Sequence, residues 1–140
     1  MSVSIKKVTL WRKELADRCG ALAEALSPLA EARADLKVLM AYRLPGSGKA
    51  VFELYPIQGK KGVSAAHAAG LQESSIPVLL VEGNNKPAVG SAICRELSAA
   101  GINLDFLVGQ ALGKKFSIVL GFESLADAQK AVGCIKRAGK

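Results

Sequence analysis

The 140-residue chain has a mass of 14.6 kDa, which is enough for one compact domain or two small ones. Half of its residues are hydrophobic and 22% are charged, a globular composition that excludes an intrinsically disordered chain. The net charge of +7 can attract anionic partners, but no apolar run approaches the ~20 residues of a membrane span, so no membrane partner is expected.

The first half of the sequence gives the weaker secondary-structure signals. Its apolar patterns predict a strand near 5–15, a helix near 18–33 and two strands near 36–43 and 49–55. A short alanine-rich helix is expected near 62–69.

The second half repeats this order with clearer boundaries. A strand over 76–82 is followed by a turn rich in helix breakers, with Asn85 as the expected N-cap and Pro87 in the first helical turn. The helix has an apolar stripe and ends at Gly101. Two strands, 102–111 and 116–122, and a last helix capped by Ser124 complete the half.

The two halves are related by an internal repeat. Residues 17–21 match 85–89 at an offset of 68, and the match continues from 29–32 to 97–100. A self-match at this period indicates a duplicated unit rather than a short solenoid repeat. We therefore expect two units, over 1–72 and 73–140.

The repeated segments resemble the ACT domain family. The family motif, Asp/Asn-Lys/Arg-Pro-Gly followed by Leu-Ala-x-Ala-Gly-Ile-Asn-Leu, is matched by 17–32 and again by 85–104. The second copy, through Gln110, is similar to the regulatory tail of aspartokinases. The resemblance implies an α+β fold of two ferredoxin-like βαββαβ units, each with an antiparallel sheet covered by helices on one face. Cys19 and Ala88 depart from the motif, which has Pro and Gly there, and in the first copy Arg33-Ala34-Asp35 replaces the Gly-Ile/Val-Asn of the motif.

A ligand site is expected at each strand-to-helix turn. Such a turn presents unpaired N–H groups at the positive end of a helix, which suits a carboxylate. Asp105, at the start of the next strand, is the candidate acceptor for an ammonium group. The resemblance implies that an effector sits between two ACT units and contacts this turn and this strand. The expected ligand-binding residues are Asn84, Asn85, Pro87, Ala88, Val89, Gly90, Asn103, Asp105 and Gln110.

The first half has its own set of candidate residues. Structural roles remain the alternative for both sets: Asn85 as a cap, Asn103 in a turn and Asp105 as a solvated strand residue. Lys37 lies where Asp105 does and reverses the charge, so we expect the two turns not to bind one ligand equally. The first-half candidates are Asp17, Arg18, Cys19 and Gly20, with Asp35 and Tyr42 as further equivalents.

The sequence gives little support for a catalytic site or a metal site. The three cysteines, Cys19, Cys94 and Cys134, are widely spaced without a CxxC motif, so we expect free thiols, with the last two in the core. A nucleophilic Cys19 would need a base, and His67 is the only histidine. Residues 46–49 resemble the end of a phosphate-binding loop but lack its other positions, so a hairpin turn is expected. We expect no enzyme activity, catalytic residue, metal or cofactor.

These observations favour a cytoplasmic, non-catalytic regulatory protein. It would bind an amino acid or related metabolite at an ACT–ACT interface, form a homodimer and act allosterically on an enzyme or regulator. One alternative is a basic nucleic-acid-binding protein on a ferredoxin-like scaffold, although aromatic residues between the basic ones are lacking. The other is a purely structural dimerisation module.

Overall fold

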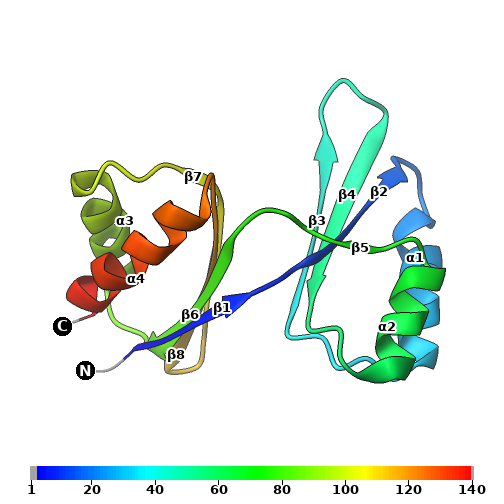
Figure 1. The fold of residues 1–140 in the computed structure, drawn as a ribbon, viewed down its shortest axis with the longest axis horizontal. Coiled ribbons are helices and arrows are strands. Elements are labelled where there is room, and N and C mark those ends of the chain that lie inside the picture. Colours follow the sequence, from blue (N-terminus) through cyan, green and yellow to red (C-terminus); the bar gives the residue numbers. More distant parts are fainter. Residues whose placement is uncertain (1–2, 140) are drawn as a thin grey trace. The chain divides into compact units, whose positions relative to one another are not determined.

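The protein forms two compact units in the structure, a computed structural model that describes residues 3–139 (Figure 1). The unit over residues 9–75 is called the continuous unit. The other, called the discontinuous unit, combines residues 3–8 with 76–139. Each has its own four-stranded sheet and its own hydrophobic core.

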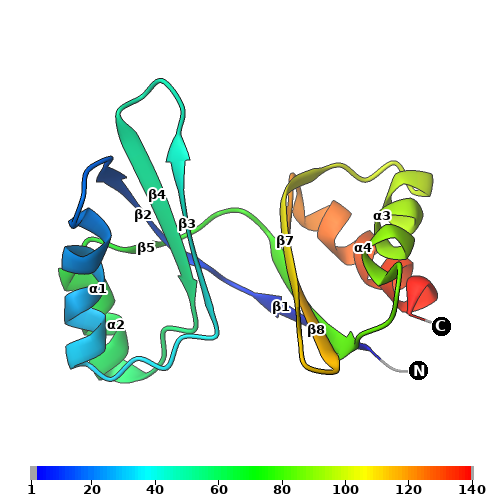
Figure 2. The same ribbon diagram turned by 180° about the vertical axis from the view of Figure 1, so that it is seen from behind.

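The continuous unit is a complete βαββαβ unit. Its sheet has the order β3-β4-β2-β5 with antiparallel pairing throughout, and its two helices lie on one face of the sheet (Figure 2). Its elements are β2 (Trp11–Ala16), α1 (Ala21–Glu31), β3 (Val38–Leu44), β4 (Lys49–Tyr55), α2 (Gly59–Ala68) and β5 (Gln72–Glu73).

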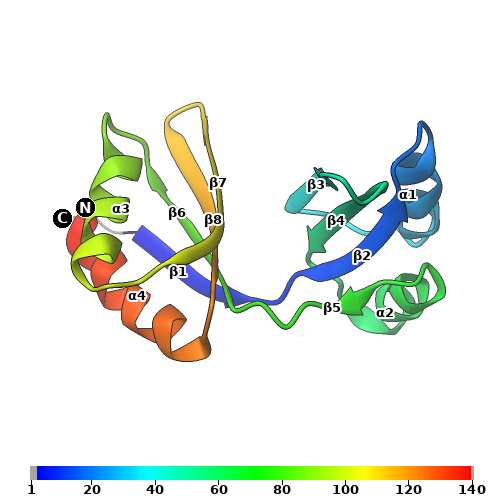
Figure 3. The same cartoon turned by 90° about the horizontal axis from the view of Figure 1, so that it is seen from above.

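The discontinuous unit reaches the same topology with a strand from the start of the chain. The order of its sheet is β1-β6-β8-β7, so β1 occupies the position that β5 has in the other unit (Figure 3). Helices α3 and α4 pack against each other and cover one face of the sheet. Its elements are β1 (Val3–Val8), β6 (Val78–Asn84), α3 (Val89–Ala99), β7 (Leu104–Leu112), β8 (Lys115–Phe122) and α4 (Leu125–Ala138).

The expected single strand over 5–15 is therefore wrong, and the units differ from the contiguous halves 1–72 and 73–140. The segment forms two strands in two different sheets. In β1, Val3 and Ile5 pack against the core of the discontinuous unit, whereas Trp11 of β2 is buried in the core of the continuous unit. Alternating apolar residues indicate which face of a strand is buried, but not which sheet the strand joins.

The duplication is confirmed in the backbone of the first helix of each unit. Helices α1 and α3 each have 11 residues and start at Ala21 and Val89, which are 68 positions apart. Their buried residues correspond one to one, with Ala21, Ala25 and Leu29 in α1 and Val89, Ile93 and Leu97 in α3.

The ends of these helices also correspond. In α3 the Ile102 N–H donates to the Leu97 carbonyl at 3.0 Å, and in α1 the Ala34 N–H donates to the Leu29 carbonyl at 3.0 Å. This 6→1 bond closes the helix around a residue with left-handed backbone. That residue is Gly101, the predicted stop, in one unit and Arg33 in the other.

Several local predictions are settled by the packing. The Ser124 hydroxyl accepts the Asp127 N–H at 3.1 Å, which confirms the cap of α4. The hairpin turn expected at 46–49 is present, formed by residues 45–48 between β3 and β4. Cys134 is buried as expected, but Cys94 is exposed, because it follows Ile93 and so points away from the face of α3 that packs on the sheet. Over residues 3–139, none of the helices combines the length and apolar character needed to span a bilayer.

Candidate ligand-binding turns

The turn between β6 and α3 differs from its predicted form. The N-cap of α3 is Ala88, whose backbone is left-handed with φ 66°, and no side chain caps the helix. Asn85 as N-cap and Pro87 within the first helical turn are therefore wrong, since both lie before the cap. Asn85 instead donates its N–H to the Lys114 carbonyl at 2.8 Å, which ties the turn to the neighbouring hairpin.

This turn leaves two backbone donors free at the start of α3. The Val89 N–H donates to the Lys86 carbonyl at 3.4 Å, and the Ala92 N–H donates to Ala88 at 2.9 Å. Between them, the N–H groups of Gly90 and Ser91 find no hydrogen-bond partner among the described residues. Unpaired donors at the positive end of a helix can bind an anion.

The turn between β2 and α1 has the same backbone. Its N-cap, Gly20, is left-handed with φ 89°, and again no side chain caps the helix. The N–H groups of Leu22 and Ala23 have no partner within residues 3–139. Both units thus present a pair of free donors at equivalent positions, 68 residues apart.

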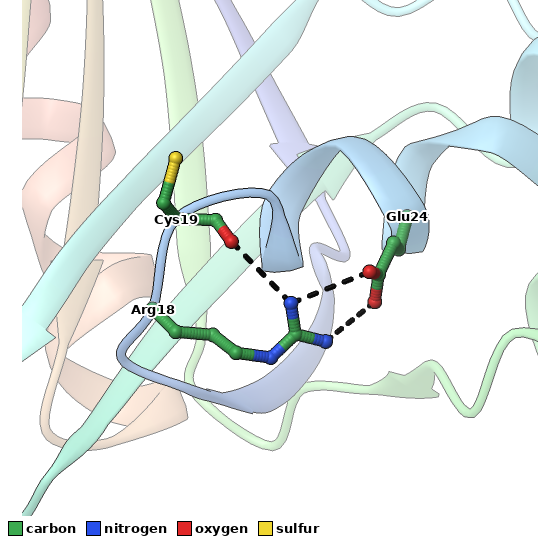
Figure 4. Close-up of polar contacts among 3 residues, drawn as sticks. All are labelled: Arg18, Cys19 and Glu24. Atoms are coloured by element: carbon green, nitrogen blue, oxygen red, sulfur yellow. Dashed lines mark hydrogen bonds and ion pairs between the residues drawn. The ribbon is translucent and has the colours of Figure 1, made fainter.

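The charges around the two turns differ. In the continuous unit, Arg18 donates to both carboxylate oxygens of Glu24, at 2.6 and 3.3 Å, and to the Cys19 carbonyl at 3.4 Å (Figure 4). The bond raises the pKa of Arg18 and lowers the pKa of Glu24. Arg43 pairs with Asp17 at 3.2 Å, so each arginine of this turn already has a carboxylate partner. A carboxylate bound at this turn would therefore compete with Glu24 and Asp17 for the two arginines.

The other turn has a simpler arrangement. The Lys115 ammonium donates a hydrogen bond to the Asn84 side-chain oxygen at 2.6 Å. Its charge has no carboxylate partner among the described residues. The free N–H groups of Gly90 and Ser91 therefore lie at a turn that keeps an uncompensated positive charge. This is the more favourable of the two turns for an anionic group.

Asn103 and Asp105 lie at the opposite end of the sheet from this turn. Asn84, beside the turn, is in register with Lys115 of β8, while Leu104 is in register with Phe122 of β8. Seven residues of β8 separate the two rows, which corresponds to roughly 20 Å at the usual rise of a strand. Within one unit, the structure does not bring Asp105 to the turn.

The residues at that far end have other contacts. Asp105 is exposed at a β-bulge, and the Asn103 amide donates to Glu123 at 3.2 Å. In the continuous unit, the equivalent Asp35 and Lys37 pair with each other at 2.9 Å.

Gln110 and its equivalent Tyr42 lie nearer to the turns. Gln110 is in register with Ser117, close to the end of the sheet where Asn84 lies. Tyr42 lines a cavity of about 230 Å³ with Asp17 and Arg18, so three of the first-half candidates come together. The other residues of this cavity are Leu15, Ala16, Ala21, Leu22, Ala41, Arg43, Ala50 and Val51.

Over residues 3–139, no group of His, Cys, Asp and Glu side chains could hold a metal ion. His67 packs its ring against Trp11, with the ring centroids 5.2 Å apart in a T-shaped arrangement. Sequence reasoning missed Glu24 and Arg43, which neutralise the first turn. The hairpin register could have placed Arg43 beside the turn, but no sequence signal links Glu24 to Arg18.

Comparisons with known proteins support the fold. No protein-family model matches the sequence, and no curated protein matches it. Among solved structures, protein BT0572 of Bacteroides thetaiotaomicron is 16% identical with a TM-score of 0.78, covering 96% of this chain and 90% of that one. The regulatory subunit of aspartate kinase from Thermus thermophilus, in its ligand-free form, is 15% identical with a TM-score of 0.64, covering 99% and 97%. The chain thus has a tandem ACT-like fold.

Proposed function

We propose that this is a non-catalytic regulatory protein that binds an amino acid or a related zwitterionic metabolite. The observation that carries the proposal is the pair of unpartnered N–H groups at each turn, Gly90 and Ser91 in one unit and Leu22 and Ala23 in the other. They suit the carboxylate that all amino acids share. The similarity of the fold to regulatory subunits of aspartate kinase supports a regulatory role.

The proposed ligand bridges two ACT units. Since the turn and Asp105 lie at opposite ends of one sheet, a ligand that touches both needs the turn of one unit and the strand of another. The second unit belongs to the same chain or to a second copy. The ligand-binding residues proposed for this arrangement remain those around Asn85 and Ala88, together with Asp105.

We propose that a homodimer supplies the second copy. Strand β7 is nine residues long and lies at the edge of its sheet, with Leu107 and Val108 exposed by 39% and 47%. A long apolar edge strand favours pairing with another strand. A ligand that binds one arrangement of such units more tightly shifts the equilibrium towards it, and an enzyme or regulator in the same cytoplasm responds to the change.

The two turns are proposed to bind one ligand unequally. Asp105→Ala removes the ammonium acceptor proposed for one site, whereas Lys37→Ala removes a side chain that pairs with Asp35 in the other unit. Isothermal titration with an amino acid that binds the wild type should show a weaker affinity for Asp105→Ala and little change for Lys37→Ala. Equal losses in the two variants would contradict the asymmetry.

The experiment that tests the proposed function is thermal unfolding of the full chain with each of the twenty amino acids at millimolar concentration. A ligand that binds only the native state raises the melting temperature. At least one amino acid should do so, and the effect should saturate. A melting temperature that none of the twenty changes would favour a purely structural module.

A further inference from the structure

Strand β2 has an edge that its neighbour β5 covers in part. Strand β5 pairs with Trp11 and Arg12, so residues 13–16 of β2 have no neighbouring strand on this side within the described part of the chain. In the discontinuous unit, β1 pairs with β6 over 78–83. Strands β2 and β6 occupy equivalent positions, 68 residues apart, so 13–15 correspond to 81–83, which β1 covers.

The backbone groups along this edge point outward. Asp17 donates its N–H to the Gly48 carbonyl at 3.0 Å, which continues the ladder between β2 and β4. Since the backbone groups of an antiparallel strand alternate in direction, Glu14 and Ala16 direct theirs away from β4. The Ala16 carbonyl accepts the Arg18 N–H at 3.0 Å. The Glu14 N–H, the Glu14 carbonyl and the Ala16 N–H have no partner among the described residues, so they can pair with an added strand.

A hollow lies beside this edge, at the place that β1 fills in the other unit. There the Val3 side chain packs against the core, and a Cβ on Gly139, the C-cap of α4, would lie 2.9 Å from it. In the continuous unit, a hollow of about 410 Å³ is lined by Ala69, the C-cap of α2. Ala21 and Ala25 of α1 also line it and are smaller than their equivalents in α3. A side chain placed like that of Val3 would therefore fill the hollow.

One charge in this hollow has no counterpart. Lys13 donates to a backbone carbonyl at the end of α2 at 2.7 Å and forms no ion pair among the described residues. The two carboxylates that line the hollow are both paired, Glu24 with Arg18 at 2.6 Å and Glu14 with Arg12 at 3.6 Å. In the register that β1 has on β6, the residue opposite Lys13 follows the one in the hollow by two positions, on the same face. An acidic residue there would pair with the lysine.

We propose that the edge of β2 over 13–16 binds a short extended segment of a partner protein as an added strand. The segment has an apolar residue that enters the hollow and, two positions later, an acidic residue that pairs with Lys13. The residue between them exchanges backbone hydrogen bonds with Glu14. The inference goes beyond the proposed function, because this binding requires no amino-acid ligand.

The edge strands of a second copy do not offer such a segment. Strands β1 and β3 contain no acidic residue. In β7, the residue two positions before Asp105 is the polar Asn103. Strand β5 has Leu71 two positions before Glu73, but Leu71 is buried in the core of its own unit. The occupant is therefore a different protein.

Three synthetic peptides test the edge. The first is acetylated and amidated and copies residues 1–5 with Ile5→Glu, which puts valine and glutamate at the required spacing. The second has Ile5→Lys instead, and the third is the first peptide with an N-methyl group on the serine that would face Glu14. Nuclear magnetic resonance of the isotope-labelled full chain follows the amides of Glu14 and Ala16. The Glu82 amide is the internal control, because Glu82 is already paired with β1.

We expect the first peptide to shift the Glu14 and Ala16 amides saturably and to leave the Glu82 amide unchanged. Lys13→Gln should weaken its binding roughly two- to fivefold, as expected for an opposite-charge pair across two strands. Lys6→Gln, at an exposed lysine of β1, is the matched control and should bind it like the wild type. The lysine peptide and the N-methylated peptide should both bind the wild type more weakly than the first peptide does.

The inference is overturned if the first peptide at millimolar concentration leaves both edge amides unmoved, or if the N-methylated peptide binds equally well. Unchanged binding of the first peptide in Lys13→Gln, together with equal binding of the lysine peptide to the wild type, overturns the acidic partner. Protection of the Glu14 amide from hydrogen exchange that increases with protein concentration, without peptide, would assign the edge to a second copy and overturn the inference as well.

Discussion

Gly20 and Ala88 occupy the same left-handed backbone position in the two units, with φ 89° and 66°. Glycine adopts this conformation at no steric cost, whereas a residue with a Cβ pays roughly 1–2 kcal/mol, partly offset by its lower entropy when unfolded. The motif therefore has a physical reason for glycine here, and Ala88 leaves one helix start strained.

Ala88→Gly should raise the free energy of unfolding by about 1 kcal/mol, and Gly20→Ala should lower it by a similar amount. Urea unfolding of the full chain measures both. Gly62→Ala is the control, because Gly62 lies within α2 with space for a Cβ and should gain stability instead. If Ala88→Gly proves destabilising, the left-handed turn at that residue is wrong.

The ion pair between Arg18 and Glu24 predicts a pH dependence of stability. The hydrogen bond from Arg18 lowers the pKa of Glu24 in the folded protein, so its contribution is present above the ordinary glutamate pKa and is lost as the pH falls through the folded value. The wild type should lose more stability than Glu24→Gln between neutral pH and pH values below about 4. Urea midpoints across this range measure the difference, which is small because the pair is exposed. Parallel curves for the two proteins would contradict the pairing.

Among the elements, the two strands at the start of the chain, β1 and β2, were not predicted correctly from the sequence. Helix spacing and the repeat located α1, α3 and α4, because a buried stripe and its stop residue are local features. The predicted cap was correct for α4, but the one predicted for α3, Asn85, lies three residues before the actual N-cap. The partner of β1 is a long-range choice that alternation leaves open. The separation of Asp105 from the turn was not predicted, although the expected antiparallel topology implies it, because β6 and β7 both pair antiparallel with β8 and hence run in the same direction.

A core substitution in β1 tests its place in the discontinuous unit. Ile5→Ala should cost about 1–2 kcal/mol, less than a fully buried isoleucine, because Ile5 is only partly buried. Hydrogen exchange should show faster exchange of the β6 amides, with β2 and β4 unchanged. Ser4→Ala, on the other face of the same strand, is the control. Loss of protection in β2 rather than β6 would contradict the pairing of β1.

The molecule as a whole carries a charge of +7, which made nucleic-acid binding the main alternative. The seven aromatic residues do not support it. Four of them are buried, namely Trp11, Phe52, Phe116 and Phe122, and among the described aromatic residues Tyr42 alone is exposed. Stacking of bases needs exposed rings. Fluorescence anisotropy with random single-stranded oligonucleotides should detect no binding at physiological salt. Tight binding there would revive this alternative.

The proposed ligand cradle is tested most directly by the amide resonances at the helix starts. In the full chain titrated with each of the twenty amino acids, at least one should shift the Gly90 and Ser91 amides, or those of Leu22 and Ala23, in a saturable way. The Asp127 amide should stay unchanged, because Ser124 already caps α4. If all twenty leave both pairs of amides unmoved, these turns do not bind amino acids.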